Sequence, residues 1–342
     1  MSTVLRLRSS PFVSIWVATA VLFAVSPLLA TGSLRGSALL SMLPFAAVLG
    51  IAAIGQTLVI QQRGLDLSVP GMITLSTIII TKYPNGSESK VPAAIGLVVL
   101  ACIVSGTISG LAITQFGITP LVATLGTGAL LQGAVLQITS GVANVSTPNG
   151  LASFALAKTA GIPNTVLIAA AALVVVTAMI RLTVLGRNFV AVGASPAAAR
   201  AAGIPVRAHE VGTYIAAALA YGGAGILIAG FLRTPGIATG NDYLLPTIAA
   251  VVLGGTSLAG GTGSVIATAV GALFLTQLEQ VVLGMGAPSS VQLVIQGSII
   301  AVGMAARTAP WHRVRSWYRH VLPQRELATQ PALSDLGDRR DP

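Results

Sequence analysis

Acidic side chains are rare in the long apolar runs of this 342-residue chain, so each one there is a candidate for chemistry. Asp66 lies in QQRGLDLSVPGM (61–72), a polar break between two apolar runs, and Glu279 lies in LTQLEQVVLG (275–284). Carboxylates so placed could relay protons or cations through a transporter. Asp66 could instead cap the next helix beside Arg63, and Glu279 could lie near the outer end of its helix. The residues alone leave both roles open.

Neutral polar side chains in the same runs offer a second kind of chemistry, which is hydrogen bonding to a hydroxylated solute. The candidates for a pathway or gate, the acid included, are Gln56, Asp66, Ser68, Gln132 and Asn144. Amide and hydroxyl side chains also join neighbouring helices within a membrane, and this is their commoner use. We therefore treat these residues as pathway candidates with a structural alternative.

Motifs that would make the chain an enzyme are missing from its sequence. It contains no G-x-x-x-x-G-K-[ST], so it cannot bind ATP through a P-loop of its own. Its three histidines form no H-E-x-x-H site, and the single cysteine, Cys102, excludes a cysteine cluster. We expect no catalytic residues, cofactor or metal here. ATP and Mg would be bound by a partner subunit, or an ion gradient would supply the energy.

The composition predicts an all-α integral membrane protein. Of the residues, 54% are hydrophobic and 8% are charged, and the mean hydropathy is +0.86. A soluble domain carries about a quarter charged residues, whereas apolar runs of about 20 residues cross a bilayer as helices. Ten such segments are predicted at 12–30, 38–61, 65–82, 91–115, 118–139, 163–183, 211–232, 246–259, 264–284 and 288–306. The eighth is short enough to be a half-helix or a re-entrant segment.

The basic residues predict the orientation and the domains. With the N-terminus inside, the outer loops hold only five of the 19 Lys and Arg residues, namely Arg35, Lys82, Lys90, Lys158 and Arg233. The positive-inside rule then places both termini in the cytoplasm of a bacterial inner-membrane protein. We expect a transmembrane domain at 1–307 and a cytoplasmic tail at 308–342. The tail begins basic and aromatic, which suits a lipid headgroup surface better than nucleic acid, and ends disordered.

The longest hydrophilic connection, 184–210, contains residues that favour the start and the end of a short helix. Ser195 is a predicted N-cap, Pro196 fits the first helical position, and Gly203 begins the predicted end of the helix. By the charge pattern this short helix is cytoplasmic. A simple connector is one interpretation of the segment, and a docking element for a cytoplasmic partner is the sharper one.

Four segments together resemble the permeases of bacterial monosaccharide ABC importers of the ribose, xylose, arabinose and galactose type. More distant relatives of these permeases transport branched-chain amino acids. The matching segments are GQTLVIQQRGLDLSVPG (55–71), FGITPLVATLGTGALLQG (116–133), LGRNFVAVGASPAAARAAGI (185–204) and IAAVVLGGTSLAGGTGS (248–264). They cover most of the predicted membrane domain in the order found in the family. Two departures stand out: Arg63 occupies a position where the family usually has glycine, and Ala194-Ser195 replaces a Gly-Asn pair.

The resemblance implies a permease subunit that works by alternating access, driven by two cytoplasmic ABC ATPase subunits. It also implies a periplasmic sugar-binding protein and a second permease, either a copy or a paralogue. Residues matching the family's coupling helix, which docks into the ATPase, are Gly193, Ser195, Pro196, Ala199, Arg200 and Gly203. The cargo would be a monosaccharide or a related polyol. The rival hypothesis is an ion-coupled secondary transporter that works alone, with Glu279 and Asp66 as relay residues.

Overall fold

The computed structural model describes residues 12–142 and 146–308, which fold mainly into α-helices. The chain divides into two units, Met1–Gly303 and Met304–Pro342, and the arrangement described below is that of the first. The predicted pathway residue Asn144 and the tail beyond Thr308 lie outside the described residues. In chain order, the longer helices are α2 (Val13–Leu29), α3 (Gly36–Gln61), α4 (Val69–Lys82), α5 (Val91–Thr114), α6 (Pro120–Thr139), α8 (Asn164–Leu182), α9 (Val184–Ala194), α11 (Val206–Leu232), α12 (Leu244–Leu253), α13 (Val265–Gly284) and α14 (Ser289–Thr308).

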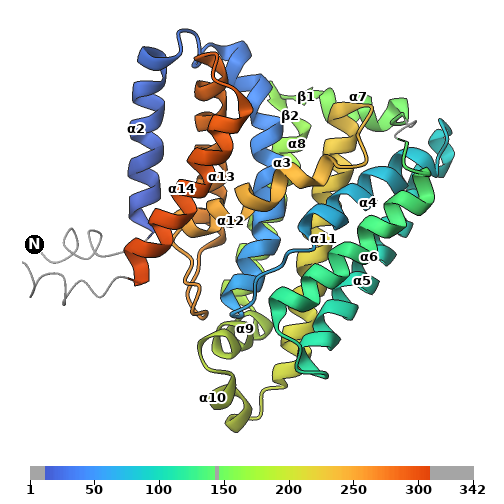
Figure 1. The fold of residues 1–342 in the computed structure, drawn as a ribbon, viewed down its shortest axis with the longest axis vertical. Helices are drawn as coiled ribbons and strands as arrows, with labels where there is room; N and C mark the ends of the chain where they lie inside the picture. Colours follow the sequence, from blue (N-terminus) through green and yellow to red (C-terminus); the bar gives the residue numbers. More distant parts are fainter. Residues whose placement is uncertain (1–11, 143–145, 309–342) are drawn as a thin grey trace, which may run out of the picture. The chain divides into compact units, whose positions relative to one another are not determined.

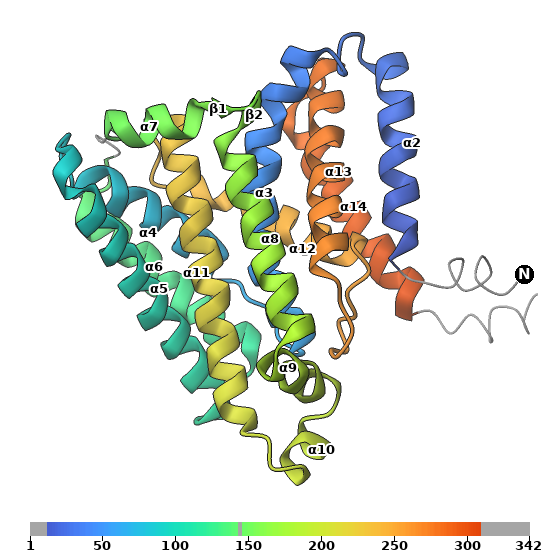
Figure 2. The same cartoon turned by 180° about the vertical axis from the view of Figure 1, so that it is seen from behind.

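Short elements complete the described fold. They are η1 (Glu88–Lys90), α7 (Asn149–Leu156), the antiparallel pair β1 (Lys158–Thr159) and β2 (Ile162–Pro163), α10 (Pro196–Ala201) and η2 (Thr239–Tyr243). In Figures 1 and 2, the α2–α3 connection, β1 and the C-terminal end of α11 lie at the end of the helices opposite to α9 and α10. Arg35, Lys158 and Arg233 belong to the first group, so three of the five basic residues assigned outside lie at one end.

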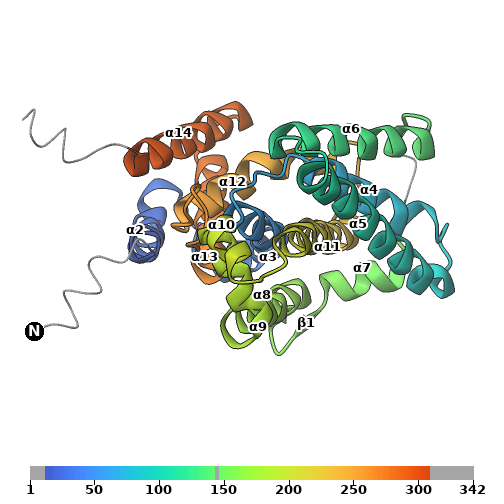
Figure 3. The ribbon, with the colours of Figure 1, turned by 90° about the horizontal axis from the view of Figure 1, so that it is seen from below.

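Two long helices, α3 and α11, form the centre of this unit. Figure 3 shows them between α12 and α13 on one side and α4, α5 and α6 on the other. One core cluster joins α3, α4, α5 and α11 around Tyr221 and Met72, which are fully buried. A second cluster joins α3 to α12 and α13 around Ile60, Ala250 and Leu275. The helices before and after the 62–68 break are α3 and α4. The first packs into both clusters and the second into one of them.

Close approach of α5 to α11 depends on the small residues of GTISG (106–110). A Cβ atom on Gly106 would lie 2.5 Å from the Cα atom of Ile215, and one on Gly110 would lie 2.8 Å from that of Val211. A glycine pair spaced by four residues is the pattern that lets membrane helices pack backbone to backbone. Cys102 is buried on the same face and fills the space beside Gly222, so it is a packing residue.

Six helical segments among the described residues are long and apolar enough to cross a membrane. They are Gly36–Gln61, Glu88–Thr114, Pro120–Thr139, Asn164–Leu182, Val206–Leu232 and Val265–Gly284. The prediction of about ten spans is thus confirmed only in part, although each predicted segment contains a helix. The helices α2, α4 and α12 have 17, 14 and 10 residues, fewer than the ~20 that a full crossing needs. The ten residues of α12 agree with the predicted half-helix.

The connection at 184–210 is more ordered than predicted. Its first part forms the eleven-residue helix α9, where only a loop was expected. The Thr183 side chain caps α9 by accepting from the Gly186 amide at 3.0 Å, and Phe189 and Val192 form its buried stripe. The segment is therefore two helices in series, α9 and α10, that join α8 to α11.

Replacing Gly106 by leucine should force α5 away from α11 and destabilise the protein. Overpacking of this kind costs about 1–3 kcal/mol, so we expect the midpoint of thermal unfolding to fall by roughly 3–10 °C. Gly96→Leu is the matched control, because Gly96 lies in the same helix with open space around it. Equal midpoints for the two variants in detergent would contradict the backbone-to-backbone packing of α5 and α11.

Candidate functional site

The short helix α10 has the boundaries that its sequence predicts. Ser195 Oγ accepts a hydrogen bond from the Ala198 amide at 3.3 Å, and Pro196 is the first helical residue. At the other end Gly203 adopts a φ of +77°, and the Ile204 amide donates to the Ala199 carbonyl at 3.0 Å. Both ends are therefore closed by local hydrogen bonds, which makes α10 a defined surface and not a loose connector.

The predicted coupling residues divide into an outward and an inward set. The outward set consists of Arg200 and Gly203, which are exposed, and of Ser195 and Pro196, which are half-buried. Ala199 is 3% exposed and packs against Val192 of α9 and Val206 of α11, while Gly193 is buried against the end of α3. The inward residues bind α10 and α9 to the helices behind them. Only the outward ones can touch a partner.

The C-terminal end of α3 holds α9 in place through two consecutive side chains. Gln62 Nε2 donates to the Phe189 carbonyl at 2.6 Å, and Arg63 Nε donates to the Gly193 carbonyl at 3.0 Å. A second nitrogen of the Arg63 guanidinium donates to the Ala194 carbonyl. The Gly193 and Ala194 carbonyls belong to the last turn of α9 and have no amide donor within the helix, and a cation is favourable there.

Arg63 occupies the left-handed position that ends α3. Its φ is +66°, its amide donates to the Ile60 carbonyl at 2.9 Å, and the Gly64 amide donates to the Val59 carbonyl at 3.0 Å. This is the Schellman arrangement, in which the left-handed residue is usually glycine. Arginine in this conformation costs roughly 1–2 kcal/mol of backbone strain. The hydrogen bonds to α9 offset that strain and explain the departure from glycine at this position.

The glycine-rich loop 254–264 packs onto the same place. The Gly261 amide donates to the Gln61 carbonyl at 2.9 Å, with Gly261 at a φ of +77°. A Cβ atom on Gly261 would lie 2.7 Å from the Cα atom of Ala194, and one on Gly193 would lie 2.2 Å from the Gln61 carbonyl oxygen. Three segments meet here, namely 61–63, 189–194 and 254–264, and we call them the α3–α9 junction.

Three of the predicted pathway residues come together in the interior, just beyond the α3–α9 junction. Asp66 Oδ1 accepts from the Ser68 amide at 2.8 Å and from the Ser68 hydroxyl at 2.6 Å. The Tyr221 hydroxyl of α11 donates to Gln56 Oε1 at 2.9 Å and also lies within hydrogen-bonding reach of Asp66. All four side chains are buried. Asp66 thus closes a turn before α4 but does not cap this helix, whose N-cap is Ser68, and Arg63 points to α9 and does not pair with Asp66.

The remaining candidates lie elsewhere. Gln132 is half-buried on α6, where its amide donates to the Ile237 carbonyl at 3.1 Å, so it joins α6 to the connection after α11. Glu279 is half-buried in the last third of α13 and hydrogen-bonds with Gln292 of α14. These two residues do not share a site with Asp66. The structure therefore does not assemble the carboxylate pair that a relay through Glu279 and Asp66 would need.

Of the residues that build the α3–α9 junction, Gly193 was predicted as a coupling residue, but Gln61, Gln62, Arg63 and Gly261 were not predicted as functional from the sequence. Gln61, Gln62 and Arg63 are polar residues at the end of an apolar run, which also describes many helix ends. The density of glycine in LAGGTGS (258–264) was the available signal, because repeated glycine indicates close backbone approach. The glycine pattern did not identify the segment that the loop contacts, which is the end of α3 at Gln61.

Arg63→Ala should destabilise the protein more than Arg63→Gly does. Both variants lose the hydrogen bonds to α9, but only alanine keeps the left-handed strain, so we expect a difference of about 1 kcal/mol in the free energy of unfolding. Denaturant unfolding of the purified chain measures it. Trypsin cleavage at Arg200 should accelerate in both variants, since α9 is no longer held. A more stable Arg63→Ala variant would refute the left-handed assignment.

Comparison with known proteins agrees with this architecture. A family model described as branched-chain amino acid transport system / permease component matches residues 38–303. The chain is 34% identical over 262 residues to a probable ABC transporter permease protein of Sinorhizobium fredii, covering 75% of this chain and 77% of the relative. It is 31% identical over 299 residues to the ribose import permease protein of Bacillus subtilis, covering 87% and 91%.

A third relative is the autoinducer 2 import system permease protein of Escherichia coli, with 32% identity over 279 residues, 79% of this chain and 84% of the relative. No solved structure matches the chain significantly. The family model covers well over half of the chain, and six of the described helical segments are apolar enough to cross a membrane. The chain therefore belongs to the permease-component family of ABC transport systems and is a multi-pass inner-membrane protein.

Proposed function

We propose that this chain is the membrane-spanning permease of an ABC importer for a monosaccharide or a related polyol. The observation that carries the proposal is the pair of helices α9 and α10, a capped surface segment tied to the end of α3. A transporter that works alone needs no such segment at the end of its helices. The importer needs one, because ATP is hydrolysed on a separate subunit and the motion must enter the membrane domain at a defined place.

The cargo class rests on the relatives and on the polar groups of this chain. Two of the relatives are named for the import of ribose and autoinducer 2, whereas the family model is named for branched-chain amino acids. The polar network near the 62–68 break holds one buried carboxylate and neutral groups, with its basic neighbour Arg63 directed away. If the pathway opens at this network, its groups would suit a neutral hydroxylated cargo better than an amino acid zwitterion. The periplasmic binding protein would supply most of the selectivity.

The route of force would run from α10 to the 62–68 break. An ATPase subunit that binds the exposed face of α10 moves α9 with it, because Ala199, Val192 and Val206 form one buried cluster. Arg63 and Gln62 would carry that motion to α3, and Gly261 would carry it to the loop before α13. Packed interfaces shift as units and not as continuous springs. A second permease, as a copy or a paralogue, would form the other wall of the pathway.

Reconstitution separates the importer from a stand-alone transporter. The chain is purified, combined with candidate ATPase and sugar-binding proteins from the same organism, and placed in liposomes. We expect ATP-dependent uptake of a pentose, hexose or polyol identified by a binding screen of the periplasmic protein, with no competition from leucine. Uptake by the purified chain alone, driven by a proton gradient, would instead establish the ion-coupled transporter.

Reversing the charge of α10 should weaken the contact with the ATPase subunit. Arg200→Glu places a carboxylate on the exposed face, and a like-charge or unpaired contact should reduce co-purification of the ATPase by roughly tenfold. Lys158→Glu is the control, since Lys158 is exposed on β1 at the opposite end of the helices. Comparable ATPase binding by the two variants would exclude α10 as the docking surface.

Gly261→Ala should reduce sugar uptake for each ATP hydrolysed while the ATPase remains bound. The added Cβ atom meets the backbone of Ala194 and separates the glycine-rich loop from α9. Gly286→Ala is the matched control, because Gly286 has nearly the same φ, +75°, with open space around it. Backbone strain is thus equal in both variants. If the ratio of uptake to hydrolysis is unchanged by Gly261→Ala, the α3–α9 junction does not transmit the motion.

A further inference from the structure

An apolar groove runs along the outer face of α8 and ends at a basic side chain. Its volume is about 360 Å³, and it is lined by Leu173, Val174, Thr177, Ala178, Leu182 and Ile266, with Arg181 at one end. A second apolar groove of about 230 Å³ continues from Leu173 between α3, α8 and α13. Little of α8 is buried by the rest of the chain, so this face meets the bilayer or a partner.

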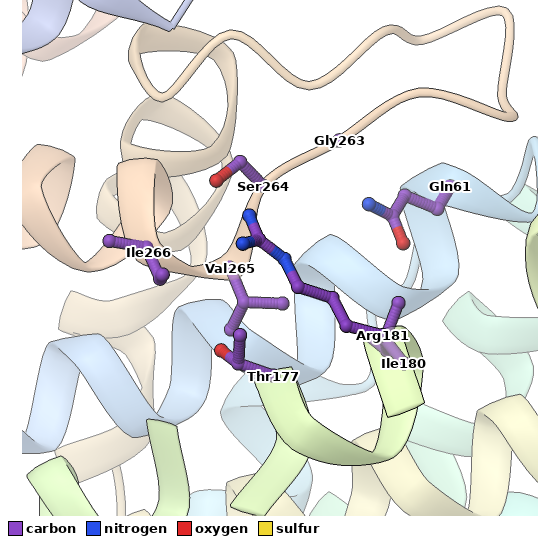
Figure 4. Close-up of a pocket in the computed structure, with 8 residues that line it drawn as sticks. All are labelled: Gln61, Thr177, Ile180, Arg181, Gly263, Ser264, Val265 and Ile266. Atoms are coloured by element: carbon purple, nitrogen blue, oxygen red, sulfur yellow. The ribbon is translucent and has the colours of Figure 1, made fainter. Parts of the chain in front are cut away.

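The basic end of the groove opens into a small polar cavity of about 30 Å³. Gln61, Thr177, Arg181 and Ser264 line it, together with the first residues of α13. In Figure 4 the Arg181 side chain extends from α8 towards Ser264, and the Gln61 amide points into the space beside them. Within the described parts of the chain, the Arg181 guanidinium has no hydrogen-bond or ion-pair partner. Its charge is therefore available to a ligand.

Two further groups face the same cavity with unused hydrogen-bonding capacity. Gln61 is 4% exposed, and its buried Oε1 atom accepts no hydrogen bond; Thr177 Oγ1 is also without a partner. The Ser264 hydroxyl already caps α13 through the Ala267 amide, at 3.2 Å. The amides of Val265 and Ile266, in the first turn of α13, have no carbonyl partner within the helix and form the positive end of its dipole. The site thus combines donors for an anion with a buried acceptor for a hydroxyl group.

We propose that this groove and cavity bind phosphatidylglycerol. Its phosphate would lie against Arg181 and the N-terminus of α13, a position that favours anions. A headgroup hydroxyl would enter the small cavity, which has room for about one water-sized group, and donate to Gln61 Oε1. An acyl chain would occupy the apolar groove along α8, which contains no charge other than Arg181. A free phosphate would leave that groove empty, and a neutral lipid would leave Arg181 unpaired.

Because the site adjoins the α3–α9 junction, a bound lipid would act on that junction. Gln61 contributes its side chain to the cavity and its carbonyl to the Gly261 amide of the α3–α9 junction. A bound headgroup would therefore hold the end of α3, the end of α8 and the start of α13 together. With the predicted orientation, the lipid belongs to the inner leaflet.

The test is native mass spectrometry of the full chain released from nanodiscs that contain equal amounts of phosphatidylglycerol and phosphatidylcholine. We expect the native chain to retain phosphatidylglycerol preferentially and Arg181→Gln to lower its retention about fivefold, as one arginine at a bilayer surface implies. Arg181→Lys should keep most of the retention. Arg207→Gln is the matched control, an exposed arginine outside the groove at the same end of the helices. Size-exclusion profiles show that each variant is folded.

Three results would overturn the proposal. Equal retention by Arg181→Gln and Arg207→Gln would show that Arg181 does not bind the lipid. Equal retention of phosphatidylcholine by the native chain would show that the groove takes any lipid. Displacement of phosphatidylglycerol by millimolar glycerol phosphate would show that the site takes a soluble anion, because such a ligand lacks the acyl chain that the groove holds. Ala178→Trp, which fills the groove and keeps Arg181, should lose the lipid as Arg181→Gln does.

Discussion

The hydrogen bonds of Arg63 to the last carbonyls of α9 join the end of α3 to the end of α9, and the neighbouring segments pack around this contact. A helix that ends within or beside a bilayer must find partners for its free backbone groups, because lipid offers none. Here side chains at the end of α3 donate to carbonyls of α9, and the Gly261 amide donates to the Gln61 carbonyl. The arrangement holds Arg63 in a strained backbone conformation. The three segments of the α3–α9 junction are therefore mutually dependent, and none can move without breaking a hydrogen bond.

The α3–α9 junction adjoins the surface helix α10, the buried polar network and the polar cavity on α8. The exposed face of α10 lies on one side of the junction, and the buried network of Gln56, Tyr221 and Asp66 lies on the other. The polar cavity at Arg181 adjoins it through Gln61. In the proposed importer, a force on α10 would reach the 62–68 break through packed side chains, and a lipid at α8 would stiffen the same helix ends. The energy source and most of the selectivity would then belong to other subunits.

The sequence predicted those features that depend on neighbouring residues. The ends of α10 were predicted correctly because Ser195, Pro196 and Gly203 act on amides and carbonyls within a few positions. The helix α9 was missed, since its buried stripe consists of only two apolar residues, Phe189 and Val192, and two glycines. Asp66 closes a local turn with Ser68 and does not cap the next helix, and the expected pairing with Arg63 was wrong. The direction of that side chain depends on contacts about 130 residues away, which no local pattern contains.

A distance measurement in the assembled importer shows whether the α3–α9 junction moves as a rigid unit. The buried Cys102 is first replaced by alanine so that only introduced cysteines carry labels. Spin labels at Ala201 on α10 and at Ala259 in the glycine-rich loop, both exposed, then report whether the two segments move together. We predict that this distance stays the same with and without ATP, while the distance between the α10 helices of the two permeases changes. A change within one chain as large as the change between the two would contradict a rigid α3–α9 junction.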